Sequence, residues 1–263
     1  MQIPFHKMEG GGNDFILLAP QYYPYVKDQG LIPEWCDRHL GIGADGLITV
    51  DFSASTAADF KMIYHNSDGS SDCFCGNGAR CAVAFAHTLQ KLPESCTFLA
   101  QDGLHTAEMH GVEDIEISLR PAHFPQAVEK GWFMNTGSRH FALQVSQPNE
   151  IDLNQLGSRW RHHQAFQPAG ANVNFWTQDE AGIYLRTFEK GVEAETLACG
   201  TGIVAVALIQ HYTEGNTSPL VEMPVRMKGG RFKVKARRTQ SQYIDIHLRG
   251  PVRHVFSGEI TIN

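Results

Sequence analysis

Two largely apolar stretches stand out in a chain whose other segments mostly alternate apolar and polar positions. Residues from about 78 to 90 and from 203 to 210 stay apolar around every side of a helix, until Gln90 and Gln210. A helix that is apolar all round is buried, whereas a surface helix keeps one polar face. The pattern therefore predicts two buried central helices, one in each half of the chain.

Short alternating segments precede and follow each predicted helix, as expected for strands of largely antiparallel sheets. In the first half the expected strands span 2–8, 14–19, 47–50, 59–64, 97–101, 104–110 and 114–119. In the second half they span 132–136, 140–146, 172–177, 182–188, 220–225, 231–235 and 243–248, and 254–262 is one strand more. Two further helices are expected at 31–39, closed by Gly41, and from Asp152 as N-cap to His162.

The order of elements is the same in both halves. It predicts an α/β (α+β) fold of two pseudo-symmetric halves, each a mostly antiparallel sheet wrapped around a central buried helix, that pack closely across a cleft. The N-terminal half is expected to span 1–119 and to be completed by the C-terminal strand 253–263, and the C-terminal half to span 120–252.

A cysteine stands just ahead of Gly-x-Gly at the start of each predicted central helix. The first stretch reads Cys75-Gly-Asn-Gly-Ala-Arg80 and the second Cys199-Gly-Thr-Gly202. Helix N-termini offer backbone N–H groups and the positive end of the helix dipole, which lower the pKa of a thiol and bind a carboxylate. Both cysteines are therefore candidates for acid–base chemistry beside an anionic substrate.

Composition narrows the classes of function. With 263 residues and a net charge of −6, the chain has no run of like charges, so neither a nucleic-acid surface nor a membrane patch is expected. The N-terminal residues lack the charged start and apolar core of a signal peptide, which favours the cytoplasm. Six cysteines are too few for a disulfide scaffold at this length.

The cysteines admit three other interpretations. Cys73, Cys75 and Cys81 form a C-x-C-x5-C cluster, but structural zinc sites draw on paired C-x2-4-C knuckles and no second pair exists, so no metal is expected. Buried structural thiols are expected at Cys36, Cys81 and Cys96. A disulfide between Cys75 and Cys199 would be an inactivated form.

Two-base proton transfer explains why two equivalent cysteines are present. A single nucleophile with His140 as its base would leave one of them without a role. If one thiolate removes the α-proton of an amino acid and the other thiol protonates the opposite face, the stereocentre inverts. This chemistry requires no organic cofactor.

Seven motifs, in order along essentially the whole chain, resemble the diaminopimelate epimerase family, cofactor-independent isomerases of lysine and peptidoglycan precursor synthesis. Besides the two cysteine stretches they are Gly10-Gly-Gly-Asn-Asp-Phe15, Gly41-Ile-Gly-Ala-Asp-Gly46, Asn66-Ser-Asp-Gly69, Asn172-Val-Asn-Phe175 and Glu189-Lys-Gly191. The resemblance implies conversion of LL-diaminopimelate to meso-diaminopimelate.

The resemblance also implies an active site in the cleft between the two halves and roles for individual residues. Cys75 and Cys199 are the base and acid pair, supported by His140 and Glu189. The reacting carboxylate is bound by four backbone amides, those of Gly76, Asn77, Gly200 and Thr201. Asn13 and Glu189 hold the reacting end with its amino group, while Asn66 and Asn172 hold the distant end.

The sequence departs from the family pattern in one place. Family members usually carry Arg where this chain has Lys190, and Asn-Pro or Ser-Pro where it has Ser138-Arg139. In the family that Arg grips the distal carboxylate, and Lys cannot form the same bidentate pair. Either Arg139 supplies the missing guanidinium or the site has shifted towards another amino acid.

The sequence therefore predicts an enzyme with a small amino-acid substrate and no nucleic-acid or membrane partner. A two-cysteine racemase for a different amino acid and a non-catalytic amino-acid-binding protein are the alternatives. The sequence leaves open whether two copies pair as a homodimer.

Overall fold

The chain folds into two compact units. The structure, a computed structural model, describes residues 1–263 except 29, 54–56, 72–73, 91, 216 and 263, so Cys73 lies outside the described residues. One unit comprises Met1–Ile117 with Gly250–Asn263, and the other comprises Ser118–Arg249. No helix in the described part of the chain is long and apolar enough to cross a membrane.

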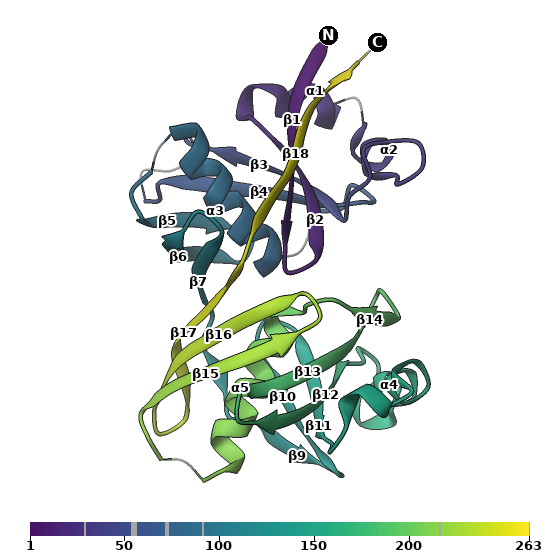
Figure 1. Ribbon diagram of the computed structural model, residues 1–263, viewed down its shortest axis with the longest axis vertical. Helices are drawn as coiled ribbons and strands as arrows, with labels where there is room; N and C mark the ends of the chain where they lie inside the picture. Colours follow the sequence, from purple (N-terminus) through teal and green to yellow (C-terminus); the bar gives the residue numbers. More distant parts are fainter. Residues whose placement is uncertain (29, 54–56, 72–73, 91, 216, 263) are drawn as a thin grey trace. The chain divides into compact units, whose positions relative to one another are not determined.

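The first unit is a sheet with one long helix and two short ones. Its strands are β1 (Gln2–Gly10), β2 (Asn13–Leu18), β3 (Gly46–Asp51), β4 (Phe60–Asn66), β5 (Ser95–Ala100), β6 (Gly103–Gly111), β7 (Asp114–Leu119) and β18 (Arg253–Thr261). Its helices are α1 (Tyr23–Asp28), α2 (Ile32–Cys36) and α3 (Gly76–Gln90), with a 3-10 turn at Pro20–Tyr22. The C-terminal strand β18 runs antiparallel beside β1 (Figure 1).

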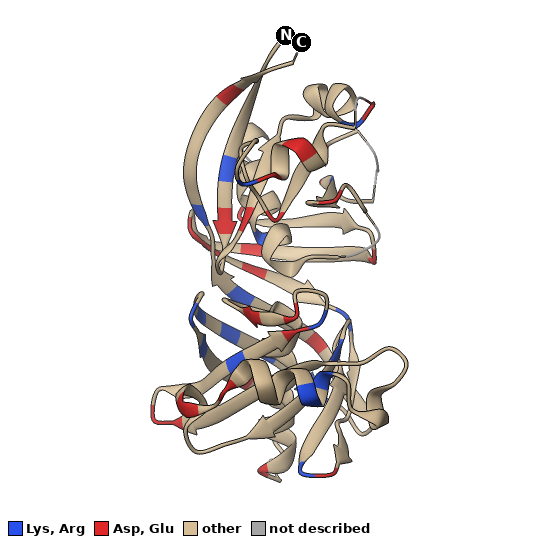
Figure 2. Cartoon of the chain, turned by 90° about the vertical axis from the view of Figure 1, so that its right-hand side faces the viewer, with Lys and Arg blue, Asp and Glu red and all other residues tan. Residues whose placement is uncertain are grey.

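The second unit repeats this plan. Its strands are β8 (Ala122–His123), β9 (Gln126–Val128), β10 (Gly131–Asn135), β11 (Arg139–Gln144), β12 (Asn172–Asp179), β13 (Gly182–Glu189), β14 (Ala194–Thr196), β15 (Leu220–Met227), β16 (Gly230–Arg238) and β17 (Gln242–Pro251). Its helices are α4 (Leu153–Arg161) and α5 (Gly200–Thr213), with 3-10 turns at Pro148–Glu150 and Gln164–Phe166. Basic and acidic positions both occur on each unit (Figure 2).

Strand pairing follows one scheme in both units. β2 and β3 pair in parallel, β3 and β4 antiparallel, and β4 and β5 again in parallel. The corresponding strands of the second unit, β11, β12, β13 and β15, pair in the same alternation. Along the chain, the long helix comes between the last two strands of each series. These two strands pair in parallel, and a parallel pair needs a crossover connection, which the helix supplies.

Both central helices are buried, as their sequence pattern predicts. α3 packs against β1, β2, β3 and β4, and α5 against β10 to β13, β15 and β16. The side chains of α5 are buried continuously from Gly202 to His211, and those of α3 from Asn77 to Ala86. Each helix begins directly after its cysteine, because the first i→i−4 bonds run from Ala79 N to Cys75 O and from Ile203 N to Cys199 O.

The smaller elements agree with the sequence only in part. Every expected strand is present with ends within three residues of the predicted ones, and Asp152 caps α4 by accepting from Gln155 N at 3.0 Å. The helix expected over 31–39 was predicted too long, because it ends at Cys36. The carboxylate of Asp37 accepts from the amides of His39 and Leu40, each at 2.7 Å, which turns the chain out of the helix.

In the second unit the sheet has a helix on each face. Successive side chains of a strand point to opposite faces, so on β11 Ala142 joins the core around α5 while Phe141 and Leu143 join the core beneath α4. His140 faces α5 together with Ala142. This alternation decides which polar side chains can reach the start of α5.

Candidate active site

Cys75 lies at the N-terminus of α3. Its sulfur accepts a hydrogen bond from the amide of Gly78 at 3.4 Å, within the first turn. The amides of Gly76, Asn77 and Gly78 precede the first intrahelical bond of α3, at the positive end of the helix dipole. Cys75 itself is half-buried. A helix start with such amides suits an anionic ligand.

Asn77 connects the start of α3 to the β1–β2 hairpin. Its side-chain amide donates to Asn13 Oδ1 at 2.6 Å, and Asn13 Nδ2 donates to Asp45 Oδ2 at 2.8 Å. The hairpin comes this close because position 10 is glycine: a Cβ there would lie 2.7 Å from the carbonyl oxygen of Asn77. Two predicted site residues, Asn13 and Asn77, are thus in direct contact.

Arg80 supports the same turn, a role that was not assigned from the sequence. Its side chain is fully buried in α3 and donates from a terminal nitrogen to Asn77 Oδ1 at 2.8 Å. Burial lowers the pKa of Arg80, and the nearby thiol groups of Cys81 and Cys75 oppose that shift. An arginine within an otherwise apolar helix was the signal in the sequence that could have identified it.

Asn66 lies at the end of β4, opposite Gly46 in the neighbouring strand. Its oxygen accepts from the hydroxyl of Tyr64 at 2.8 Å, and its amide donates to Ser70 Oγ at 2.9 Å. The side chain is therefore held by two hydroxyl groups at a strand end, where loops often carry binding residues.

Cys199 is the N-cap residue of α5 and is buried. Its sulfur lies 3.6 Å from the hydroxyl oxygen of Thr201 in the first turn. The backbone carbonyl of Thr201 accepts from the hydroxyl of Thr136 at 2.8 Å. The amides of Gly200, Thr201 and Gly202 precede the first intrahelical bond, as in α3.

His140 supports this turn from β11. Its Nε2 lies 2.9 Å from Thr201 Oγ1 and 3.0 Å from Ser138 Oγ, and Nδ1 lies 3.1 Å from Asn174 Nδ2. Asn174 Oδ1 accepts from Thr187, so its amide nitrogen is the donor to Nδ1 and the imidazole proton resides on Nε2. Burial lowers the pKa of His140 to about 3.

His140 is therefore neutral at physiological pH. It is linked to Cys199 indirectly, because the Thr201 hydroxyl contacts both the imidazole and the sulfur. The close packing requires glycine at 202, because a Cβ there would lie 2.8 Å from Asn174 Oδ1 and 3.2 Å from His140 Cε1. Asn174 lies in the motif Asn172-Val-Asn-Phe175, but the sequence assigns it no role. Its position on β12, two residues after Asn172, places both amides on the face towards α5.

The remaining predicted residues of the second unit gather at the ends of β12 and β13. Asn172 Oδ1 accepts from the backbone amide of Lys190 at 2.8 Å, and its Nδ2 lies 3.4 Å from Ser138 Oγ. Glu189 accepts from the hydroxyl of Thr196 at 2.8 Å. Lys190 is exposed.

Arg139 points elsewhere. It precedes His140 on β11, so its side chain belongs to the opposite face of the sheet. Its guanidinium carbon lies 5.3 Å from the ring centroid of Phe133, which packs in the core beneath α4. The structure therefore does not group Arg139 with Asn172 and Glu189.

The other described cysteines are buried, as predicted for structural thiols. Cys36, Cys81 and Cys96 are each at most 6% exposed. Burial raises the pKa of Cys36 and of Cys96 to about 11 and raises that of Cys81 further. Their thiols therefore remain protonated at neutral pH.

One group of side chains in the described part of the chain could hold a metal ion. Donor atoms of Glu108, His110 and Glu116, on β6 and β7, lie within 4.8 Å of one another. Glu108 and Glu116 face each other across the strand pair, and His110 Nε2 lies 3.2 Å from a Glu116 oxygen. None of the three belongs to the predicted site.

Known proteins match the whole length of this chain. A family model described as "Diaminopimelate epimerase" matches residues 5–124 and 132–255. The diaminopimelate epimerase of Flavobacterium psychrophilum is 37% identical over 257 residues, covering 97% of this chain and 99% of the relative. That of Chlorobaculum tepidum is 39% identical over 264 residues, covering 97% and 100%.

Solved structures match at the level of the fold. A PhzF-family phenazine biosynthesis protein of Bacillus anthracis has a TM-score of 0.75 at 16% identity, covering 100% of both chains. A hydroxyproline epimerase from Agrobacterium vitis has a TM-score of 0.72 at 13% identity, covering 98% of this chain and 91% of that one. Together with the repeated strand pairing, they confirm the predicted fold class.

Proposed function

Because the chain belongs to the diaminopimelate epimerase family, we propose that it inverts one α-carbon of LL-diaminopimelate, giving the meso form, by proton transfer between Cys75 and Cys199. It is accordingly an isomerase. The reaction belongs to lysine and peptidoglycan precursor synthesis. The observation that carries the mechanism is the repetition, in both units, of a cysteine directly before a buried helix with Gly-x-Gly in its first turn.

The proton balance needs only two thiols. One starts as thiolate and takes the α-proton, and the other starts as thiol and gives its proton to the opposite face of the same carbon. The electron pair of the broken C–H bond is delocalised into the substrate carboxylate and then forms the new C–H bond. At the end the two thiols have exchanged protonation states, and exchange with water resets them.

The helix starts support the charge that develops on the substrate carboxylate. Amides of Gly76, Asn77, Gly200 and Thr201 bind it, with the positive ends of both helix dipoles. Such fixed donors cost no reorganisation during the reaction. Neutral His140, hydrogen-bonded to Thr201 beside Cys199, orients the first turn of α5 and adds no competing charge.

Binding residues then divide into a reacting end and a distant end. Asn13 and Glu189 hold the amino group of the reacting centre. Asn66 and Asn172 hold the distant end, and Lys190 pairs with the distal carboxylate. The backbone bond from Lys190 to Asn172 supports this grouping, whereas the guanidinium of Arg139 lies over Phe133. Lys binds a carboxylate as a point charge, so distal recognition is looser than with Arg.

A substrate panel tests the proposal. Purified, freshly reduced protein is incubated with LL-diaminopimelate and with single enantiomers of monocarboxylate amino acids, and products are separated by chiral chromatography. The unchanged protein is expected to convert LL-diaminopimelate. Cys75→Ala and Cys199→Ala should each, separately, lower this turnover by about 10²- to 10⁴-fold. Turnover only of a monocarboxylate amino acid would favour the alternative racemase. Calorimetric binding without isomerisation would favour a binding protein.

A further inference from the structure

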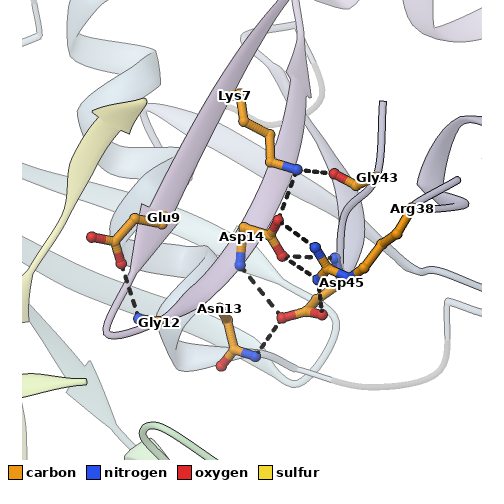
Figure 3. A network of polar contacts seen from close by, with 8 residues as sticks. All are labelled: Lys7, Glu9, Gly12, Asn13, Asp14, Arg38, Gly43 and Asp45. Atoms are coloured by element: carbon orange, nitrogen blue, oxygen red, sulfur yellow. Dashed lines mark hydrogen bonds and ion pairs between the residues drawn. The ribbon is translucent and has the colours of Figure 1, made fainter. Parts of the chain in front are cut away.

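A cluster of four charged side chains in the first unit lies next to Asn13, and one of them bonds to its side chain. We call its members Lys7, Asp14, Arg38 and Asp45 the Asp45 clamp. They come from β1, from β2, and from the segment between α2 and β3, and they contact one another, while Asp45 alone of the four bonds to the Asn13 side chain (Figure 3). None was assigned a role from the sequence.

The clamp fixes which way the Asn13 carboxamide faces. Its nitrogen donates to Asp45 Oδ2 at 2.8 Å, and its oxygen accepts from Asn77 Nδ2 at 2.6 Å. A flipped carboxamide would place its oxygen against the carboxylate oxygen of Asp45 and its nitrogen against Asn77 Nδ2, so the flip would lose both hydrogen bonds. One N–H and one lone pair of Asn13 then remain in a defined orientation for a ligand.

Arg38 holds Asp45 in turn. Its guanidinium donates to both oxygens of Asp14, at 3.0 and 2.6 Å, and to Asp45 Oδ1 at 2.7 Å. Two adjacent carboxylates would repel each other without this cation. Lys7 adds a second cation, 2.8 Å from Asp14 and also bonded to the carbonyl of Gly43.

The charge state of the cluster is set by its geometry. Burial opposes ionisation of Asp14, but hydrogen bonds from Arg38 and Lys7 outweigh it and lower the pKa of Asp14. The pKa of Arg38 is raised mainly by its hydrogen bond to Asp14. The fork shape of Arg38 is what lets one side chain hold two carboxylates, since a Lys ammonium has no such planar geometry.

We propose that Arg38 and Asp45 are positioning residues for the epimerisation: they orient Asn13, and through Asn13 the side chain of Asn77 at the helix start beside Cys75. This inference rests on the proposed function, because it assigns the clamp to that reaction. Neither residue needs to touch the substrate.

Kinetics of clamp variants test this inference. Asp45→Ala is expected to lower kcat/KM for LL-diaminopimelate by about 10- to 100-fold, the scale of a misplaced binding group. Asp45→Asn keeps one acceptor oxygen at similar size and should lose less. The control is Arg237→Ala, which breaks an exposed Arg–Asp pair of 2.8 Å with Asp245 in the second unit and should stay within about twofold of the unchanged protein.

A double-mutant cycle separates positioning from a general loss of stability. If the clamp acts through Asn13, Asp45→Ala should cost less than about twofold in an Asn13→Ala background, because coupled residues are not additive. Equal losses from Asp45→Ala with and without Asn13 would overturn the inference, as would full activity of Asp45→Ala. Thermal unfolding of every variant checks that each is folded.

A second readout needs no substrate. In the unchanged protein the side-chain NH₂ signals of Asn13 and Asn77 should exchange slowly with water in NMR spectra, and each is identified by its loss in the corresponding Asn→Asp variant. Asp45→Ala should speed exchange at both, and Arg237→Ala at neither. Unchanged exchange in Asp45→Ala would overturn the orienting role. Absence of turnover in the unchanged protein would instead contradict the proposed function, and the NMR result would still decide on the clamp.

Discussion

Acid should destabilise this protein through His140. The imidazole is completely buried, and its contacts are neutral: Ser138, Thr201 and Asn174. Its pKa is about 3 in the folded chain, against an ordinary value of 6.5. Between these pH values the unfolded chain binds a proton that the folded chain does not. Stability therefore rises with pH in this window and falls as the pH drops from 6.5 towards 3.

The size of the effect follows from the two pKa values. One pKa unit corresponds to about 1.4 kcal/mol, so moving from pH 7.5 to pH 5 should remove about 2 kcal/mol of unfolding free energy through His140 alone. That is a large part of the roughly 5–15 kcal/mol by which domains are stable. His211 in the same unit, whose pKa burial also lowers, adds to the slope.

Urea unfolding followed by tryptophan fluorescence can measure this slope. Three of the four tryptophans, Trp132, Trp160 and Trp176, lie in the second unit, so the signal reports mainly on the unit that contains His140. His140→Gln removes the titrating group and keeps a polar side chain. The unchanged protein should lose about 2 kcal/mol more than this variant between pH 7.5 and 5. Parallel losses in both proteins would refute the assignment of a buried neutral imidazole.

Three further predictions concern other parts of the structure. Cys36 and Cys96 should resist alkylation by iodoacetamide at pH 7.5 in the folded protein, since burial raises the pKa of each to about 11, and mass spectrometry should find them modified only after unfolding. Gly202→Ala should lower kcat and lower the free energy of unfolding in urea by about 1–3 kcal/mol, because the added Cβ would clash with Asn174 and His140. Unchanged kinetics would contradict the packing of these two side chains against the helix start. Lys190→Arg should lower KM for LL-diaminopimelate with little change in kcat, through a bidentate pair with the distal carboxylate, and an unaltered KM would remove Lys190 from that role.

The sequence predicts the fold well because the repeated pattern is strong. Two apolar stretches, each preceded by a cysteine and Gly-x-Gly, are unambiguous signals of buried helices. The alternating segments then locate every strand of the meanders. The short elements β8, β9 and β14 were not predicted, since two or three residues carry no readable period.

Side-chain contacts between distant segments are harder to predict. Arg38 looks like an ordinary surface charge in the sequence, and Asp45 lies in a family motif that gives it no role. Only the fold brings Asp45 to Asn13, 32 positions away in the chain, and Arg38 to Asp45. The helix predicted over 31–39 shows the same limit, because the carboxylate of Asp37 caps the following turn and overrides helical propensity. Arg139 was one candidate for the missing guanidinium, yet strand alternation directs it towards Phe133.

The most direct test of two-base proton transfer is the fate of the α-hydrogen. LL-diaminopimelate is converted in deuterated buffer, and the meso product is analysed by mass spectrometry and proton NMR. Transfer through two separate thiols predicts one solvent deuterium at the inverted α-carbon of each product molecule, with the other α-carbon unlabelled. Retention of the original hydrogen at the inverted carbon would contradict it, because a single group would then have carried the proton from one face to the other.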